Sequence, residues 1–480
     1  MLDTEFFLGP IVAPLLIVIS TVLFYWYSTQ NFDYWKKRNI PYVKPIPFVG
    51  SVVENLTKVF SSHWRQDSGQ HVVCLNGGLE RIRTILPTFT TRKIKDIFKE
   101  CADTLVQNFK NASKDGKSVE LKTIYGAFTM DVIASSAFST KIDSHNDPEN
   151  QFVKTAQNVF RINFSWRFLL FFLFPNLVKW IGLSIFSPKA TYFFRDVTLQ
   201  IMEERRKTGQ TRNDFLQLLM DTAKEVSEDP KSEFHQKESD ETSAVYGDVD
   251  INHQVFKSVT KKNLSLDELV AQCVIFFLAG YDTTASTLSF VSYLLALHPE
   301  IQEKVHEELV EAVTQTNGKL TYEALQNMKY MDNVISETLR LFPPAVRLER
   351  KAVGDYKLAD TGITIPKGMI VTIPSYAMHR DPELFPDPER FDPDRFTPEE
   401  RAKRDQYSYL PFGAGPRNCV GMRFALMEIK VCLACVVANF KIKRCPETKV
   451  PLKFLVGAGL LQPIDVTVAL ERRDDNPIVK

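Results

Sequence analysis

A glycine-rich loop that runs directly into an apolar, helix-like stretch constrains this chain more than any other feature. The loop reads Phe-Gly-Ala-Gly-Pro-Arg-Asn-Cys-Val-Gly over residues 412–421, and the apolar stretch follows over 422–440. Glycines allow tight turns and a close approach of the backbone to a flat ligand. The start of a helix offers free N–H groups and a positive dipole end, which favour the thiolate form of Cys419 and suit it to metal binding. Arg417 adds a cation that can hold a carboxylate through two hydrogen bonds.

The loop also has two less informative interpretations. Gly413-Ala-Gly415 is similar to the start of a dinucleotide-binding fingerprint, but Asn418 stands in place of the third glycine and no β-rich segment precedes it. A lone cysteine in an intracellular protein is usually a buried structural residue. The fixed spacing of Phe, Gly, Arg and Cys in the loop favours the metal-binding interpretation.

The run Phe-x-x-Gly-x-Arg-x-Cys-x-Gly resembles the haem-binding signature of the cytochrome P-450 family of haem-thiolate monooxygenases. The resemblance implies a mainly α-helical fold with a small β-sheet. It also implies heme b as cofactor, Cys419 as the axial iron ligand, and Phe412 and Arg417 beside the haem. The implied reaction inserts one atom of dioxygen into a lipophilic substrate, with electrons from NADPH. The implied partners are NADPH–cytochrome P-450 reductase, cytochrome b5, membrane lipid and a small lipophilic substrate.

A long buried helix is predicted after Ser265. Ser265 and Glu268 form a capping box that opens the helix. The stretch 270–296 contains a single charged residue, Asp282, but too many hydroxyl and amide side chains for lipid. We therefore predict a helix through the centre of the protein, ending at the His298-Pro dipeptide.

The middle of this helix reads Ala-Gly-Tyr-Asp-Thr-Thr over 279–284, which resembles the family's oxygen-activation motif. The small side chains of Ala279 and Gly280 would let a planar ligand lie against the backbone. By the resemblance, Asp282 and Thr283 would deliver protons to bound dioxygen. The alternative is that the threonine side chain hydrogen-bonds to the preceding helical turn.

Two further motifs predict a charge cluster. Glu-Thr-Leu-Arg over 337–340 and Pro-Asp-Arg-Phe over 393–396 resemble the family's Glu-x-x-Arg helix and Pro-x-Arg-Phe segment. An i, i+3 ion pair alone is common on exposed helices. The resemblance implies a Glu337–Arg340–Arg395 cluster that locks the segment before the haem loop.

The resemblance also assigns residues around the haem. The segments 345–350 and 362–373 alternate and turn like short strands. Arg350 and Arg83 would join Arg417 on the haem propionates, and Ala279 would lie against the ring. The apolar residues expected to face the substrate are Phe276, Phe277, Ala345 and Val346.

The chain departs from the family before Arg83. Between Gly50 and Arg83 it is several tens of residues shorter than the family's usual span, and Leu79 replaces the tryptophan of the Trp-x-x-x-Arg haem contact. This departure leaves two alternatives to the monooxygenase. One is a haem-thiolate isomerase or dehydratase that needs no reductase, and the other is an inactive shortened variant that does not hold haem.

An uncharged stretch over residues 6–27 predicts a membrane helix. Asp3 and Glu5 precede it and Lys-Lys-Arg at 36–38 follows it, so the positive-inside rule leaves the rest of the chain in the cytosol. We expect a single-pass signal anchor within residues 1–30 in the endoplasmic reticulum membrane, with a cytosolic catalytic domain.

The remainder of the chain is expected to form one haem domain. A proline-rich hinge is predicted over 31–50, followed by the haem domain over 51–480, which shows no internal repeat. Residues 222–263 are rich in Glu, Lys, Ser and Asp and predict a flexible loop. The apolar run 164–186 is expected to dip into the membrane, with a core helix pair as the alternative.

Charge and cysteine content narrow the possible partners. The chain has 59 basic and 58 acidic residues, so nothing favours nucleic acid. Its seven cysteines, an odd number without the spacing of secreted frameworks, indicate a reducing compartment. Cys432 and Cys435 share one helix face in an apolar run and are expected to be core residues. A candidate docking face for an electron donor, with a solvated surface as the alternative, comprises Arg92, Lys93, Lys95, Arg423 and Lys430.

Overall fold

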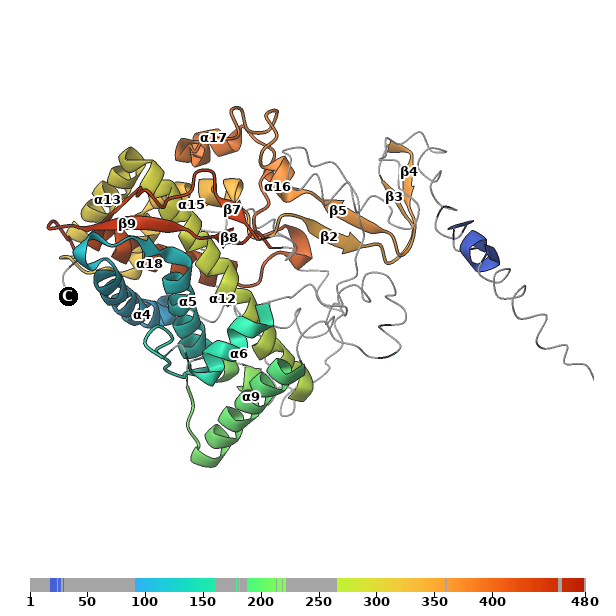
Figure 1. The fold of residues 1–480 in the computed structure, drawn as a ribbon, viewed down its shortest axis with the longest axis horizontal. Coiled ribbons are helices and arrows are strands. Elements are labelled where there is room, and N and C mark those ends of the chain that lie inside the picture. Colours follow the sequence, from blue (N-terminus) through green and yellow to red (C-terminus); the bar gives the residue numbers. More distant parts are fainter. Residues whose placement is uncertain are drawn as a thin grey trace, which may run out of the picture. The chain divides into compact units, whose positions relative to one another are not determined.

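A computed structural model describes most of the chain from residue 91 onward (Figure 1). The described residues are 18–23, 25–26, 29, 91–147, 149–160, 178, 181, 188–212, 214–217, 219–221, 266–358, 361–455 and 460–478. The predicted hinge, the predicted loop over 222–263, Arg83, Leu79 and nearly all of 164–186 lie outside these residues. Two compact units are defined, one of Met1–Val72 with Arg347–Ala377 and the other of Val73–Val346 with Met378–Lys480.

Helices form most of the larger unit. The longer ones are α4 (Thr91–Ala112), α5 (Leu121–Phe138), α6 (Gln151–Phe160), α9 (Pro188–Thr208), α12 (Leu266–Leu297), α13 (Pro299–Thr314), α15 (Lys329–Leu341) and α18 (Met422–Asn439). The shorter ones are α14 (Tyr322–Asn327), α17 (Pro398–Ala402) and the single turns Lys114–Gly116, Pro393–Phe396, Gln406–Ser408 and Gly415–Arg417. A further short helix, α16, covers Ser375–Met378, and all but its last residue belong to the smaller unit.

Helix α12 is the central element of this unit. It packs against α5, α9, α13, α15 and α18. Within the described part of the chain, its segment Glu268–Leu297 is the one stretch long and apolar enough to cross a membrane, yet more than half of its most apolar window is buried in the protein. The prediction of a buried central helix ending before Pro299 is therefore confirmed.

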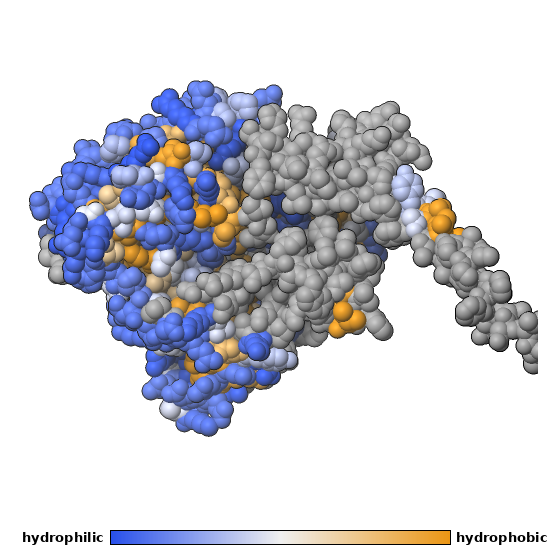
Figure 2. Space-filling model, in the orientation of Figure 1, coloured by the Kyte–Doolittle hydropathy of each residue, from blue (hydrophilic) through white to orange (hydrophobic). Residues whose placement is uncertain are grey.

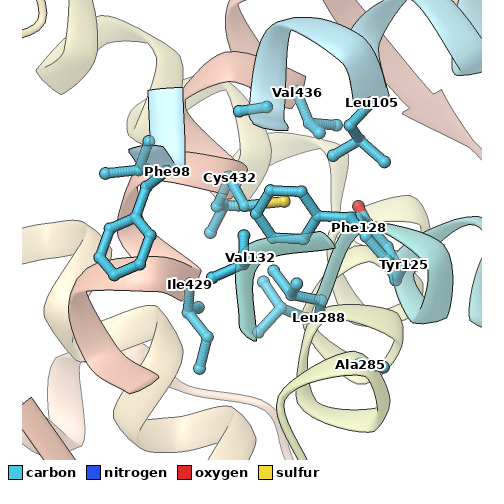
Figure 3. Close-up of a cluster of buried hydrophobic side chains, with 14 of the residues drawn as sticks. Phe98, Leu105, Tyr125, Phe128, Val132, Ala285, Leu288, Ile429, Cys432 and Val436 are labelled. Carbon is cyan, nitrogen blue, oxygen red and sulfur yellow. The ribbon is translucent and has the colours of Figure 1, made fainter. Parts of the chain in front are cut away.

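The core also accounts for the Cys-x-x-Cys pair. Cys432 and Cys435 lie on α18, which packs against α4, and both side chains are buried. Figure 3 shows Cys432 in a cluster of buried side chains that also includes Phe128 and Val132 of α5. Burial raises the pKa of Cys435 to about 12 and that of Cys432 well above its ordinary value. Both groups are thus neutral thiols in the core, as predicted.

Small antiparallel sheets complete the larger unit. Strand β9 (Thr467–Arg472) lies between β1 (Val119–Glu120) and β6 (Phe440–Lys443), and β7 (Lys453–Phe454) pairs with β8 (Pro463–Ile464). Because β6 follows α18 directly, the sheet ties the end of that helix to the C-terminal strand. This mainly helical architecture with little sheet confirms the predicted fold class.

The described part of the smaller unit consists mainly of two hairpin-like strand pairs. Strand β2 (Leu348–Lys351) pairs antiparallel with β5 (Ile370–Ile373), and β3 (Tyr356–Leu358) pairs with β4 (Ile363–Ile365). Gly368 has a φ of 85° in the turn that joins β4 to β5, a conformation that glycine adopts without strain. Strands β2, β4 and β5 overlap the two segments that the sequence predicts to be strand-like, 345–350 and 362–373, whereas β3 lies between these segments.

The N-terminal helix belongs to the same unit and is described in part. Residues 18–23, 25, 26 and 29 are helical. Val18, Val22, Leu23 and Trp26 are each more than half exposed. In the larger unit, by contrast, the face drawn in Figure 2 is mostly hydrophilic, with small apolar patches.

Candidate functional site

The backbone of the glycine-rich loop holds Cys419 in place. Gly413 and Gly415 have φ angles of 73° and 71°, so both turns need the left-handed conformation that glycine permits. The N–H of Gly413 donates to the carbonyl of Leu410 at 3.2 Å, and the N–H of Cys419 donates to the carbonyl of Phe412 at 2.8 Å. The loop is thereby closed on itself immediately before α18, and the position of the Cys419 thiol is set by backbone geometry.

A cavity of about 260 Å³ lies between this loop and α12. Helix α12 lines it with Ala279, Gly280 and Thr283, and the loop lines it with residues 416–421, including Cys419. The other described lining residues are Ile133, Phe215, Gln272, Ile275, Phe276, Thr284, Phe424 and Ala425.

The residues of this cavity fit a haem. Among the described residues, no group of three or more His, Cys, Asp or Glu side chains could hold a bare metal ion. A single thiol therefore suits a metal that brings its other ligands with it, as iron in a porphyrin does. The lining is mostly apolar, which suits a porphyrin ring, and Arg417 offers a cation for its carboxylates.

Gly280 has a second role that the sequence did not suggest. A Cβ added at this glycine would lie 2.5 Å from Cδ1 of Ile133 on α5. Ile133 is buried and also lines the cavity, so a side chain at position 280 would have to displace the end of the Ile133 side chain. Thr129 of the same helix donates from its hydroxyl to the carbonyl of Tyr281 at 3.1 Å. Gly280 therefore allows α5 and α12 to pack closely beside the cavity, in addition to lining it.

The structure places Asp282 and Thr283 on different sides of α12, because neighbours in a helix point about 100° apart. Thr283 lines the cavity, and its hydroxyl donates to the carbonyl of Ala279 at 2.7 Å. This hydrogen bond to the preceding helical turn is the one expected from the sequence as the alternative to a role in proton delivery. Thr283 thus makes that bond and lines the cavity at the same time.

Asp282 is buried and is absent from the described lining residues. Its carboxylate accepts a hydrogen bond from Nε2 of Gln462 at 2.5 Å and lies 3.4 Å from Nζ of Lys122. Sequence reasoning found neither partner. Both lie far away in the chain, and neither belongs to a motif that points to α12.

The predicted charge cluster is brought together. Glu337 and Arg340 are both fully buried and form two hydrogen bonds of 2.6 and 2.8 Å. Nε of Arg395 lies 3.6 Å from the same carboxylate, which also accepts the N–H of Asp392 at 2.9 Å. Arg340 donates further to the carbonyl of His379 at 2.8 Å. Three segments of chain therefore converge on one buried pair.

The predicted substrate residues divide into two groups. Phe276 lines the cavity, whereas Phe277 is fully buried, with its ring centroid 4.8 Å from that of Phe194 and 5.0 Å from that of Phe152. Phe277 is thus placed as a core residue. Ala345 forms an isolated bridge with Leu460, and neither Ala345 nor Val346 is among the described lining residues.

Three other predicted residues lie elsewhere. Arg350 is on β2 of the smaller unit, where its guanidinium donates to the carbonyl of Glu349 at 2.9 Å, and its role stays a prediction. Lys430 is buried and pairs with Asp332 at 2.9 Å, so it cannot belong to the candidate docking face. Arg423 is partly buried, and the side chains of Arg92, Lys93 and Lys95 lie outside the described residues.

The fold and this thiol-bearing cavity define a haem-thiolate protein, and comparison with known proteins assigns the family. The profile of the cytochrome P450 family matches residues 51–247 and 247–467, so the chain belongs to the cytochrome P450 family. The predicted class of enzyme, a haem-dependent cytochrome P450 monooxygenase, is confirmed with it.

Individual relatives align with this chain over nearly its whole length. The chain is 36% identical to cytochrome P450 3A12 of Canis lupus familiaris, over 96% of each chain. It is 36% identical to cytochrome P450 3A9 of Rattus norvegicus, over 94% of each. To cytochrome P450 3A7 of Homo sapiens it is 35% identical, over 96% of this chain and 97% of that one. The alignments with 3A12 and 3A7 span 519 positions against the 480 residues of this chain, so each contains gaps on this side.

Proposed function

We propose that this cytochrome P450 oxidises a small lipophilic substrate, of xenobiotic, steroid or fatty-acid type, with NADPH electrons delivered by a reductase. The observation that carries the proposal is the mostly apolar cavity with Cys419 on one wall and Thr283 on the other. Such a cavity offers few polar contacts to a substrate, so it favours ligands that bind by apolar burial.

Haem bound to Cys419 supplies the chemistry of dioxygen activation, which a thiolate ligand promotes. Cys419 needs a fixed position for this, and the bond from its N–H to Phe412 provides one. Arg417 would bind a propionate from the loop wall. Ala279 and Gly280 would leave room for the ring on the α12 wall.

The proton path is proposed to end at Thr283. Its hydroxyl hydrogen is directed to the carbonyl of Ala279, so its oxygen can accept a hydrogen bond from within the cavity. Asp282 would have to leave both Gln462 and Lys122 to reach the same side of α12. Lys122 is about a quarter exposed, so the carboxylate is one side chain away from solvent. We propose that protons enter along this route and that breaking these two contacts is part of their delivery.

Reductase and membrane contacts complete the proposal. The exposed apolar side chains of Val18, Val22, Leu23 and Trp26 suit a helix that lies in lipid, which supports an N-terminal anchor in the endoplasmic reticulum membrane. Membership of the cytochrome P450 family makes a reductase the expected electron donor, and we propose cytochrome b5 as a second one.

The test is a spectrum followed by reconstitution. The reduced protein with carbon monoxide should show the strongly red-shifted Soret band of thiolate ligation. Adding NADPH and a P450 reductase should then consume NADPH in the presence of lipophilic substrates and give oxygenated products. Turnover without reductase would favour the isomerase or dehydratase alternative. Absence of bound haem would favour the alternative of an inactive shortened variant.

A further inference from the structure

We propose that His379 is a positioning residue for the thiolate loop, which it fixes through a hydrogen bond to the backbone at the start of the loop. The imidazole is fully buried, and its Nε2 accepts the N–H of Leu410 at 2.9 Å. Leu410 lies two residues before Phe412, whose carbonyl accepts the N–H of Cys419. The His379 side chain therefore fixes the start of the loop, close to the Phe412 carbonyl that binds the Cys419 N–H.

The geometry selects one tautomer of this histidine. An Nε2 atom that accepts a hydrogen bond carries no proton, so the ring proton resides on Nδ1. Burial, together with the charges of Arg340 and Arg380, lowers the pKa of His379 to about 3, so the ring stays neutral and Nε2 stays an acceptor at physiological pH.

The backbone of His379 is itself anchored to the charge cluster. Its carbonyl accepts a hydrogen bond from Arg340 at 2.8 Å, and Arg340 is held by Glu337. A second link runs nearby, because the hydroxyl of Tyr409 donates to the carbonyl of Ser336 on α15 at 2.8 Å. The buried Glu337–Arg340 pair is thus connected to the thiolate loop by a continuous path that passes through His379.

The aromatic side chains around the His379 ring offer no substitute for its hydrogen bond to the Leu410 N–H. The ring centroid of His379 lies 5.2 Å from that of Tyr409 and 6.4 Å from that of Phe385. A phenylalanine of similar size would keep these ring contacts but leave the N–H of Leu410 buried without an acceptor. Loss of the bond should therefore act on the loop more than on the packing of the core.

The experiment compares three variants of the full chain. His379→Phe keeps a ring and removes the acceptor, whereas His379→Gln keeps an oxygen that can reach the Leu410 N–H. His306→Phe is the matched control, since His306 is also buried but lies among Arg473, Asp475, Glu303 and Lys441, away from the thiolate loop. The first readout is the fraction of haem that gives the red-shifted band after reduction with carbon monoxide. The second is hydrogen exchange of the segment 408–421, measured on apo and haem-loaded protein.

For His379→Phe we expect a clear loss of the red-shifted fraction and exchange of the Leu410 and Cys419 amides about tenfold faster, the scale of one lost buried hydrogen bond. His379→Gln should recover most of both signals, and His306→Phe should retain them. Wild-type values in His379→Phe, an equal defect in His379→Gln, or an equal defect in His306→Phe would each overturn the proposal.

This inference rests on the proposed haem-thiolate function, but the two can fail separately. A wild-type protein without the red-shifted band would contradict the proposed function. An unprotected Leu410 amide in the folded wild-type protein would contradict the role of His379, whatever the spectrum shows. That second measurement also decides the matter if His379→Phe does not fold.

Discussion

The two walls of the cavity are held in different ways. The wall that carries Cys419 is a loop whose shape depends on polar contacts from distant segments, through His379 and the buried Glu337–Arg340 pair. The wall that carries Thr283 is a continuous helix whose shape depends mainly on its own hydrogen bonds and on apolar packing from α5, with added polar contacts at Tyr281 and Asp282. The loop wall should therefore be sensitive to changes made far from it, and the helix wall only to changes on its packed or lining faces.

The largest effect should come from the ligand itself. Cys419→Ser should abolish the red-shifted Soret band and oxygenation, because Cys419 is the only thiol among the described residues that line the cavity. Cys435→Ala is the matched control, since Cys435 lies on α18 but in the core. Spectra of the two reduced proteins with carbon monoxide decide the question. A red-shifted band that survives in Cys419→Ser would contradict the assignment of this residue.

A charge removed at a distance should disturb the loop wall almost as much. Glu337→Gln leaves Arg340 buried without its counter-charge, which typically costs about 3–5 kcal/mol. We expect lower stability in chemical denaturation together with loss of bound haem. Arg395→Gln should cost less, because Arg395 lies farther from the carboxylate, at 3.6 Å, and is slightly exposed. Equal losses in both variants would show that the bidentate pair is not the centre of the cluster.

On the helix wall, Thr283→Ala should leave the thiolate band intact and change the reaction instead. Loss of a proton-transferring group typically lowers rates about 10²–10⁴-fold, so product formed per NADPH consumed should fall while NADPH oxidation continues. Thr283→Ser keeps the hydroxyl and should restore coupling. The measurement is product and peroxide per NADPH in the reconstituted system. Unchanged coupling in Thr283→Ala would exclude this hydroxyl from the proton path.

Packing from α5 gives a smaller effect on the same wall. Gly280→Ala would place a methyl group 2.5 Å from Cδ1 of Ile133, and overpacking of a core typically costs about 1–3 kcal/mol. The companion change Ile133→Val removes that Cδ1 atom and should recover part of the loss in the double variant. Thermal denaturation of the two single variants and the double variant measures this coupling. Additive effects would mean that the two residues do not meet.

The features that the sequence could predict are those that depend on local signals. The bounds of α12 and the start of α18 follow from local signals, such as the capping box at Ser265, the proline after His298 and the glycine-rich loop. The polar contacts that fix both walls are long-range, and His379 and Lys122 carry no local signal for them. Phe276 and Phe277 are adjacent in sequence, so only the rotation of α12 in the packed fold decides which one faces the cavity.

We expect the smallest effect from a buried carboxylate on α5. Asp131 accepts the N–H of Ser144 at 3.0 Å, and burial raises its pKa from 3.8 to about 6. Between those two values the folded state binds more protons than the unfolded state, so the contribution of this group to stability falls as pH rises through 6. Asp131→Asn keeps the acceptor oxygen and removes this cost.

At pH 7.5 we therefore expect Asp131→Asn to be more stable than the wild type by about 1–3 kcal/mol, one pKa unit being worth about 1.4 kcal/mol. The gain should shrink as pH falls and vanish near pH 4, where the wild-type carboxyl is protonated in both states. Denaturation midpoints between pH 4 and 8 test this. Removing a charge on α5 would then stabilise the protein, whereas Glu337→Gln beside the loop destabilises it. A loss of stability in Asp131→Asn at pH 7.5 would show that α5, the helix that packs against α12, depends on this buried charge.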